Sequence, residues 1–492
     1  MVGAVTESFM QRTAIFSGLL FAVALLVFVS PVRAQTNQDL EACKKETDPD
    51  LQIQSCSHAI DAGKLSDPDL AVAFNARGIA YDAKNMHDRA IEDYDQSIRL
   101  NPSYAAAFYN RGCAYNNKAD YDRAIQDFNQ ATRLNPDDGD AFFGRGSAYL
   151  SKHEYDRAIQ DFGRAIVLDP NDADAFFNRG MAYGGKNDYD HAVQDYGNAI
   201  RLNPNDPSAF YNRGFAYFSI GEFDRAIQDY DQALRLSPND PNAYYGRGFV
   251  YRHKGDYDRA IRDYDQAIRL NPNFADAYDN RGIVYRLKGE YDRAIQDFDQ
   301  AVRLNPKDAD AFNNRGNAYR NKGDYDRAIR DYDQAIQLDP NNVNALINRG
   351  FARFLQGPAS ASVADFASSA ALAPADPYRV LWLYLAKTRA GQNVDSVLSA
   401  ARKLDLVPWP GPILSFFLKK TDRAALLEAA HNLNTGRERA QLCEAHFFLA
   451  EYELVWSLQA TAVADLQEAA NTCPASEMEY ETARAELKRL GH

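Results

Sequence analysis

Apolar and polar residues follow one another along most of the chain with the spacing of amphipathic helices. Between residues 310 and 341 this pattern predicts two short helices. The residues that share one face of the first helix are Phe312, Gly316 and Tyr319, and those of the second helix are Ala328, Tyr332 and Ala335. Between the helices stand Gly323, which suits the end of a helix, and Asp324, which suits the start of the next. We therefore expect a helix–turn–helix hairpin.

This hairpin recurs along the chain at a constant interval. The dipeptide Arg-Gly appears nine times at a step of 34 residues. Its arginines are Arg77, Arg111, Arg145, Arg179, Arg213, Arg247, Arg281, Arg315 and Arg349. A fixed step without insertions indicates one supersecondary unit, repeated and stacked as a solenoid.

The repeated unit resembles the tetratricopeptide repeat (TPR), whose signature is W-x2-L-G-x2-Y, then A-x3-F, then P. The residues that carry the resemblance in one unit are Phe312, Gly316, Tyr319, Ala328, Tyr332 and Pro340. It covers residues 71–376 and implies an all-α fold, a right-handed superhelical solenoid of about nine 34-residue helix–turn–helix units. The signature leucine is missing, because arginine replaces it in every unit.

Two further helical regions flank the repeats. Residues 35–70 are expected to form an N-terminal cap, since "DLQIQSCSHAIDAG" has the apolar spacing of a second helix. Residues 377–492 are expected to form a helical C-terminal domain that includes a degenerate TPR-like hairpin. This tail is similar to the C-terminal region of bacterial cell-envelope TPR adaptor proteins.

Each arginine of the Arg-Gly dipeptides is followed 16 residues later by an aspartate. In a hairpin that turns near the glycine these two positions face each other, so we expect structural ion pairs. Arg213 with Asp229 and Arg315 with Asp331 are examples. Two alternatives remain: the arginines bind a ligand, or they pair with the neighbouring unit.

A ligand surface is implied by the resemblance, because the first helices of TPR units line the concave side of the solenoid. Aromatic candidates there are Tyr109, Phe143, Phe177, Tyr211 and Tyr245. Amide and guanidinium candidates are Asn212, Asn280, Asn314, Asn348, Arg252, Arg286 and Arg320. The rings suit apolar or proline side chains, and the amides and guanidinium groups suit peptide carbonyls and carboxylates. The second group is similar to TPR carboxylate clamps, although their lysines are absent. Alternatively, the asparagines order the backbone and the arginines are merely solvated.

The N-terminus has the features of an export signal over residues 1–34. Arg12 precedes an apolar run of 15 residues, and a small-residue cleavage pattern ends at Ala34. As a helix this run would measure about 22 Å, short of a hydrocarbon core of about 30 Å. We therefore expect a cleaved signal and an exported, periplasmic protein. The alternative is an inner-membrane anchor with a periplasmic array, and either Met1 or Met10 is the true start.

The five cysteines are consistent with an oxidising compartment. Cys43 with Cys56 and Cys443 with Cys473 are candidates for two local disulfides, which would leave Cys113 unpaired. The alternative is five free thiols.

Composition and motifs argue against several functional classes. The net charge of −13 excludes a general nucleic-acid binder, which needs a basic footprint. The sequence contains no nucleotide-binding, hydrolase or metal-binding motif, so we expect no catalytic residue, no cofactor and no metal.

The expected function is that of a non-enzymatic protein–protein interaction scaffold in the bacterial envelope. It would bind an extended peptide or protein segment in the concave groove and contact the membrane only through an uncleaved signal. The alternative is a structural component of an envelope assembly, such as polysaccharide export, docked through residues 377–492. The export signal argues against a third possibility, a cytosolic chaperone adaptor.

Overall fold

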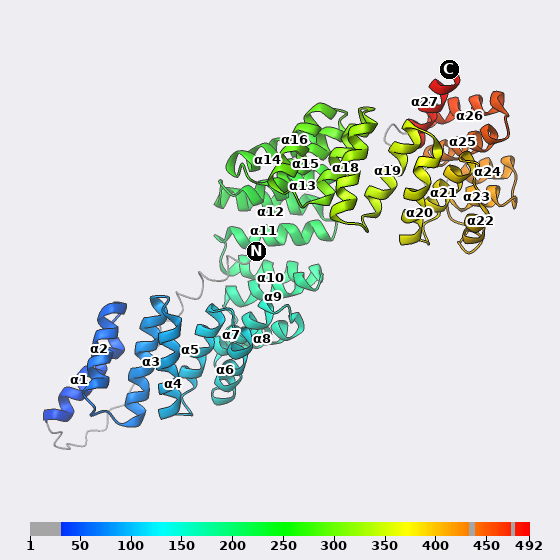
Figure 1. Ribbon diagram of the computed structural model, residues 1–492. Helices are drawn as coiled ribbons and strands as arrows, with labels where there is room; N and C mark the ends of the chain where they lie inside the picture. The colour runs from blue at the N-terminus through cyan, green and yellow to red at the C-terminus, as the bar shows by residue number, and fades with distance from the viewer. Residues whose placement is uncertain (1–30, 432–437, 474–477) are drawn as a thin grey trace. The chain divides into compact units, whose positions relative to one another are not determined.

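The computed structural model describes residues 31–431, 438–473 and 478–492, and every regular element in these ranges is a helix (Figure 1). The structure divides into two compact units, one ending at Pro238 and one starting at Asn239. Within each unit consecutive helices pack in antiparallel pairs, and each pair packs on the next. This is the arrangement of a TPR solenoid. The predicted signal lies outside the described residues except for residues 31–34, which begin the first helix.

The first unit contains the cap and five helical pairs. Its helices are α1 (Pro31–Lys45), α2 (Pro49–Asp61), α3 (Asp67–Ala83), α4 (His87–Leu100), α5 (Ala105–Asn117), α6 (Tyr121–Leu134), α7 (Gly139–Ser151), α8 (Tyr155–Leu168), α9 (Ala173–Gly185), α10 (Tyr189–Leu202), α11 (Pro207–Ser219) and α12 (Phe223–Leu236).

The second unit contains four further pairs and the C-terminal helices. They are α13 (Pro241–His253), α14 (Tyr257–Leu270), α15 (Ala275–Leu287), α16 (Tyr291–Leu304), α17 (Ala309–Asn321), α18 (Tyr325–Leu338), α19 (Val343–Gln356), α20 (Val363–Leu372), α21 (Pro377–Arg389), α22 (Asp395–Ala401), α23 (Gly411–Phe417), α24 (Arg423–Ala430), α25 (Glu438–Val455), α26 (Gln459–Thr472) and α27 (Met478–Leu490). A 3-10 turn, Ala359–Ser362, precedes α20.

The α17–α18 pair shows why the repeated residues form a hairpin. Gly323 has a φ of +83° and reverses the chain, and the Asp324 carboxylate accepts a hydrogen bond from the Arg327 amide at the start of α18. Gly316 lets the helices approach closely, because a Cβ there would lie 2.6 Å from the ring of Tyr332. The Tyr332 ring is therefore completely buried between the two helices.

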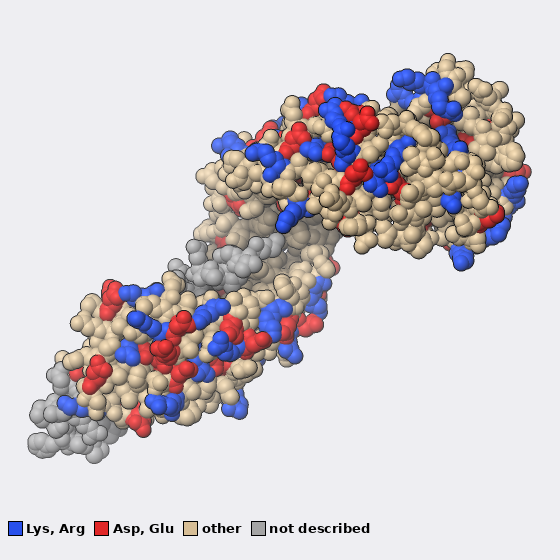
Figure 2. Space-filling view, in the orientation of Figure 1, with Lys and Arg blue, Asp and Glu red and all other residues tan. Residues whose placement is uncertain are grey.

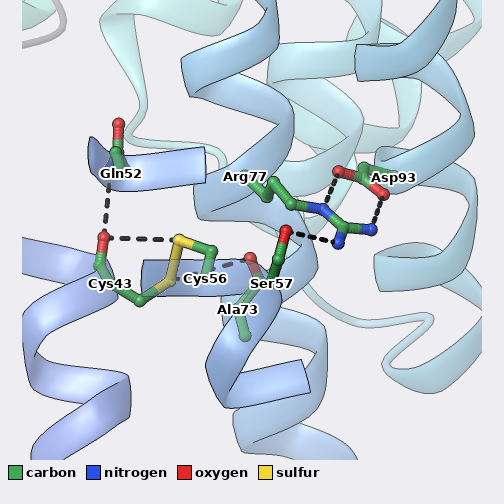
Figure 3. Close-up of a disulfide and its surroundings, with 7 residues drawn as sticks. All are labelled: Cys43, Gln52, Cys56, Ser57, Ala73, Arg77 and Asp93. Atoms are coloured by element: carbon green, nitrogen blue, oxygen red, sulfur yellow. Dashed lines mark hydrogen bonds and ion pairs between the residues drawn. A yellow bond between two sulfur atoms is a disulfide. The ribbon is translucent and has the colours of Figure 1, made fainter. Parts of the chain in front are cut away.

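The cap joins the array through a disulfide and two polar contacts (Figure 3). Cys43 of α1 is bonded to Cys56 of α2, with their Cα atoms 4.5 Å apart. Arg77 of α3 donates to the Ser57 hydroxyl at 3.0 Å, and Lys84 forms an ion pair with Asp50. Later lysines make the same contact 30 residues back rather than 34. Helix α2 therefore takes the place of a second helix, four residues out of step with the array.

The C-terminal helices continue the array with a different core. Trp382 of α21 is 2% exposed and packs against aromatic rings of α19, α20 and α25. The α25–α26 hairpin is closed at its open end by a disulfide between Cys443 and Cys473. In the described ranges we find no helix with both the length and the apolar character that a membrane span requires.

Candidate functional site

The arginines of the Arg-Gly dipeptides lie in a lattice of ion pairs between helices. Arg281 of α15 donates to both carboxylate oxygens of Asp297 on α16, at 2.8 and 2.6 Å. Its remaining amino group pairs with Asp265 of the preceding unit. The pairs 16 residues apart are Arg77–Asp93, Arg111–Asp127, Arg145–Asp161, Arg179–Asp195, Arg213–Asp229, Arg247–Asp263, Arg281–Asp297, Arg315–Asp331 and Arg349–Asp365. Their donors are engaged in packing, which leaves little for a ligand.

Burial and pairing oppose each other in this lattice. Burial raises the pKa of Asp297, although its hydrogen bonds from Arg281 act to lower it. For Arg281, burial alone would lower the pKa, but the hydrogen bonds to Asp297 and Asp265 outweigh it and raise the pKa. The net effect favours a charged guanidinium that bridges two repeats.

The aromatic groove candidates pack against the second helix of their own unit. Their ring contacts are Tyr109–Phe128, Phe143–Phe162, Phe177–Tyr196, Tyr211–Tyr230 and Tyr245–Tyr264, with centroids 5.5 to 5.9 Å apart. Phe143 is only 7% exposed, so its ring belongs to the core and offers almost no surface to a partner. The other four rings are half-buried and keep one edge accessible.

The asparagine candidates form amide contacts between neighbouring first helices. Asn280 donates to the Tyr245 hydroxyl at 3.1 Å, Asn314 to the Asp279 carboxylate at 3.1 Å, and Asn348 to the Asn313 carbonyl at 2.9 Å. Each contact joins residues 35 apart in the sequence. Asn212 instead donates to the carbonyl of Ser208 in its own helix. These amides hold the inner helices in register.

The three arginine candidates form what we call the arginine row: Arg252, Arg286 and Arg320. They lie on α13, α15 and α17, and these helices contact one another directly. All three Nε atoms are buried and have no hydrogen-bond partner in the described structure. Burial and the neighbouring Arg320 lower the pKa of Arg286. The row therefore presents desolvated cationic donors, for which a carboxylate is a suitable partner.

The row ends beside a cavity of about 1720 Å³ in the second unit. Its walls include Arg320, Asn321, Phe354 and, from helix α27, Glu481 and Arg484. The Glu481 carboxylate accepts a hydrogen bond from Asn321 Nδ2 at 2.5 Å and lies 3.5 Å from Arg320 Nε. Sequence reasoning missed Asn321 and Glu481, because neither recurs with the 34-residue period.

A second feature lies at the turn of the α25–α26 hairpin. Trp456 and Leu458 are 61% and 53% exposed. They stand where the α17–α18 turn has Lys322 and Asp324, and Ser457 between them has the positive φ of Gly323. An apolar tip thus replaces a charged one. Elsewhere in the described ranges, no cluster of three or more His, Cys, Asp or Glu side chains is placed to hold a metal.

Family models cover most of the array. Models described as "TPR repeat" match residues 185–221, 216–252, 282–323 and 316–357, and models described as "Tetratricopeptide repeat" match residues 71–104, 93–126, 111–175, 241–274 and 263–296. No curated protein matches the chain.

Solved structures of several bacterial repeat proteins are similar to parts of it. MamA is 30% identical, with 34% of this chain and 96% of that chain covered and a TM-score of 0.32. YrrB, "a TPR protein with an unusual peptide-binding site", is 26% identical, with 38% and 96% covered and a TM-score of 0.33. PilF of Pseudomonas aeruginosa is 20% identical, with 42% and 94% covered and a TM-score of 0.38. Scores this low carry no argument about function. On the family models and the stacked helical pairs, the chain belongs to the tetratricopeptide repeat proteins.

Proposed function

We propose that the arginine row binds an acidic segment of a partner protein. As a TPR protein the chain is a protein–protein interaction scaffold, and proteins of this family are generally non-catalytic. The observation that carries the proposal is the set of three buried Nε donors without hydrogen-bond partners, repeated at 34-residue steps on contacting helices. Buried donors are normally satisfied, and a charged acceptor satisfies a guanidinium most strongly.

The surroundings of the row favour an extended acidic segment over an isolated ion. Arg252 lies over the ring of Phe249, with its guanidinium carbon 4.7 Å from the ring centroid. Arg320 donates to the Asn348 side chain at 3.2 Å, so the amide contacts fix its position. Three fixed cations one repeat apart match successive carboxylates better than a single charge, and the half-buried Tyr245 beside them suits an apolar side chain.

The proposed location is the bacterial envelope, most simply the periplasm, with an inner-membrane-anchored form as the alternative. Its support is the pair of disulfides, Cys43–Cys56 and Cys443–Cys473, which is typical of proteins folded in an oxidising compartment. Fractionation of cells that express the full-length chain, with mass spectrometry of its mature N-terminus, tests both forms.

A labelled acidic peptide tests the binding proposal. We expect a fluorescein-labelled ten-residue glutamate peptide to bind the full-length protein, measured by fluorescence anisotropy at two salt concentrations. Arg286→Ala should weaken binding at least about tenfold, because a charge-assisted hydrogen bond contributes roughly 1.5–3 kcal/mol. The matched control is Arg330→Ala on α18, which removes an exposed arginine outside the row. Equal affinities for these two variants would reject the proposal.

The exposed tip at Trp456 and Leu458 favours a second candidate function, a structural component of an envelope assembly docked through the C-terminal domain. Exposed Trp at the centre of a small apolar patch is typical of a docking contact. Here Trp456→Ser should abolish co-purification of a stable complex that Arg286→Ala leaves intact. The reverse pattern would favour the groove.

A further inference from the structure

We propose that helix α27 is a built-in competitor for the arginine row, with Glu481 in the place of a ligand carboxylate. An acidic partner would then reach all three arginines only after it displaces α27. This inference rests on the proposed function of the row and adds its regulation.

The contact of Glu481 is of the kind proposed for the ligand. Its carboxylate takes a hydrogen bond from Asn321 at 2.5 Å and lies 3.5 Å from Arg320 Nε. Arg320 is 8% exposed, so the acid meets it in a largely desolvated site. At the two preceding positions the Nε atoms of Arg252 and Arg286 have no hydrogen-bond partner in the described structure. Helix α27 thus occupies one of three repeated positions, and the other two are left for a partner.

The attachment of α27 is polar enough to be reversible. Its most buried residues are Glu479, Thr482, Ala483 and Glu486. None of these side chains is large and apolar, so their burial provides little hydrophobic stabilisation. Larger side chains such as Leu487 pack only partly buried against the C-terminal core. A helix held in this way has a small free energy of docking.

The second anchor of α27 is weakened by a competing acid. Glu486 accepts a hydrogen bond from Arg389 at 2.8 Å, but the same guanidinium also binds the completely buried Glu451 at 2.6 Å. Burial raises the pKa of Glu451 to about 7, because one arginine cannot offset two buried carboxylates. Release of Glu486 would leave Arg389 to Glu451 alone. The anchor therefore resists displacement only weakly.

The cavity beside α27 provides a route for the partner. It lies between α17, α19, α21 and α27, and exposed Arg484 and Lys488 stand at its edge. Figure 2 shows basic side chains gathered on the surface at α27. An acidic segment that follows the row toward Arg320 would meet these cations before it meets Glu481. Charge thus attracts the competitor of α27 to the site that α27 covers.

The test compares two charge-matched variants of the full-length protein with the same fluorescein-labelled glutamate peptide. Glu481→Gln removes the competing carboxylate, and Glu468→Gln removes an exposed one from α26. If α27 covers the third position most of the time, the apparent affinity is reduced by the uncovered fraction. We expect Glu481→Gln to bind the peptide about fivefold or more tightly than wild type, and Glu468→Gln to bind as wild type does. Hydrogen exchange of residues 478–490 should rise when peptide is added to the wild type.

The outcomes separate this inference from the function on which it rests. Equal affinities for Glu481→Gln and Glu468→Gln, with binding still sensitive to Arg286→Ala, would overturn the competitor role and leave the row as a binding site. Unchanged or slower exchange in residues 478–490 on peptide addition would overturn it as well. No binding to any variant would refute the proposed function itself, and the competitor role with it.

Discussion

Arg423 at the start of α24 donates two hydrogen bonds to the carboxylate of Asp465 on α26, one of them 2.7 Å long. Asp465 stands in the α25–α26 hairpin where Asp331 stands in α17–α18, but the position of Arg315 is taken by buried Leu449. An arginine from a third helix has thus replaced the missing repeat arginine. His446 completes the site with a ring nitrogen 2.7 Å from the same carboxylate. The carboxylate is kept even where its repeat partner is lost, which shows how strongly this buried position requires a cation.

Replacing Arg423 should destabilise the C-terminal hairpin. Asp465 is 2% exposed, and a buried acceptor that loses its donor costs about 1–3 kcal/mol. Arg423→Gln should therefore speed hydrogen exchange in α25 and α26. Arg402→Gln, an exposed arginine after α22, is the matched control and should leave exchange unchanged. Equal exchange in the two variants would show that His446 alone satisfies the carboxylate.

The same variant should unfold at a higher pH in acid. Burial acts to raise the pKa of Asp465, but hydrogen bonds from His446 and Arg423 outweigh it, so the pKa is lowered. A lowered carboxyl pKa contributes stability above the unfolded value of about 3.9, and this contribution is lost as the pH falls through the folded pKa. Without Arg423 that loss begins at a higher pH. Melting temperatures of wild type and Arg423→Gln between pH 3 and 7 should diverge most near pH 4.

The Arg213–Asp229 pair predicts a rescue. Arg213 Nε lies 2.7 Å from Asp229, whose side chain is 7% exposed. Arg213→Leu leaves this carboxylate buried without its cation, which costs roughly 3–5 kcal/mol. Arg213→Leu combined with Asp229→Leu removes both charges and should recover much of the loss. Urea unfolding of the single and double variants measures the difference, and equal midpoints would mean that Asp229 finds another partner.

Repetition is what made the helical array and its arginine–aspartate spacing predictable from the sequence. Nine copies of each residue at a fixed step turn a single ambiguous arginine into a pattern with a geometric meaning. The all-helical TPR fold was predicted correctly for the same reason. Arg423 could not be predicted in this way, since it lies 42 residues before Asp465 and has no counterpart in other units.

The candidate surface was less predictable because one residue position serves two purposes. Phe143 and Tyr211 share a repeat position, yet Phe143 is buried against Phe162 while Tyr211 keeps an exposed edge. Helical spacing gives the direction of a side chain but not the room that its neighbours leave. Glu481 escaped notice for a different reason, because only the folded C-terminal domain brings it to Arg320.

Two glycines interrupt the lattice and offer a stabilising change. Arg315 reaches Asp299 of the preceding unit at 2.8 Å, but the equivalent positions before Arg179 and Arg213 are Gly163 and Gly197. A Cβ at Gly163 would lie 3.6 Å from an Arg179 amino group, so a side chain fits. Gly163→Asp should raise the free energy of unfolding by about 0.5–1 kcal/mol, from helix propensity and a half-exposed ion pair.

Alanine separates the two contributions at Gly163. Alanine exceeds aspartate in helix propensity by about 0.7 kcal/mol, so Gly163→Asp should match Gly163→Ala only if the ion pair forms. Denaturation in low salt should show this equality, and 1 M salt should remove it by screening. An aspartate variant that falls below the alanine variant in both conditions would mean that Arg179 does not reach across.

Asp279 predicts a pH dependence on the inner face of the second unit. Burial, with nearby Asp308 and Asp276, raises its pKa to about 6, although the hydrogen bond from Asn314 acts to lower it. Between about pH 4 and 6 the folded state then holds a proton that the unfolded state has lost, so stability falls as the pH rises. The shift from 3.8 to about 6 corresponds to at most about 3 kcal/mol. Asp279→Asn should abolish the penalty and keep the amide contact, because Asn313 accepts the same hydrogen bond from Asn348 one unit later. The variant should melt with wild type at pH 4 and above it at pH 7.5, whereas Glu468→Gln should track wild type throughout. Parallel melting curves for Asp279→Asn and wild type would place the Asp279 carboxyl in contact with solvent.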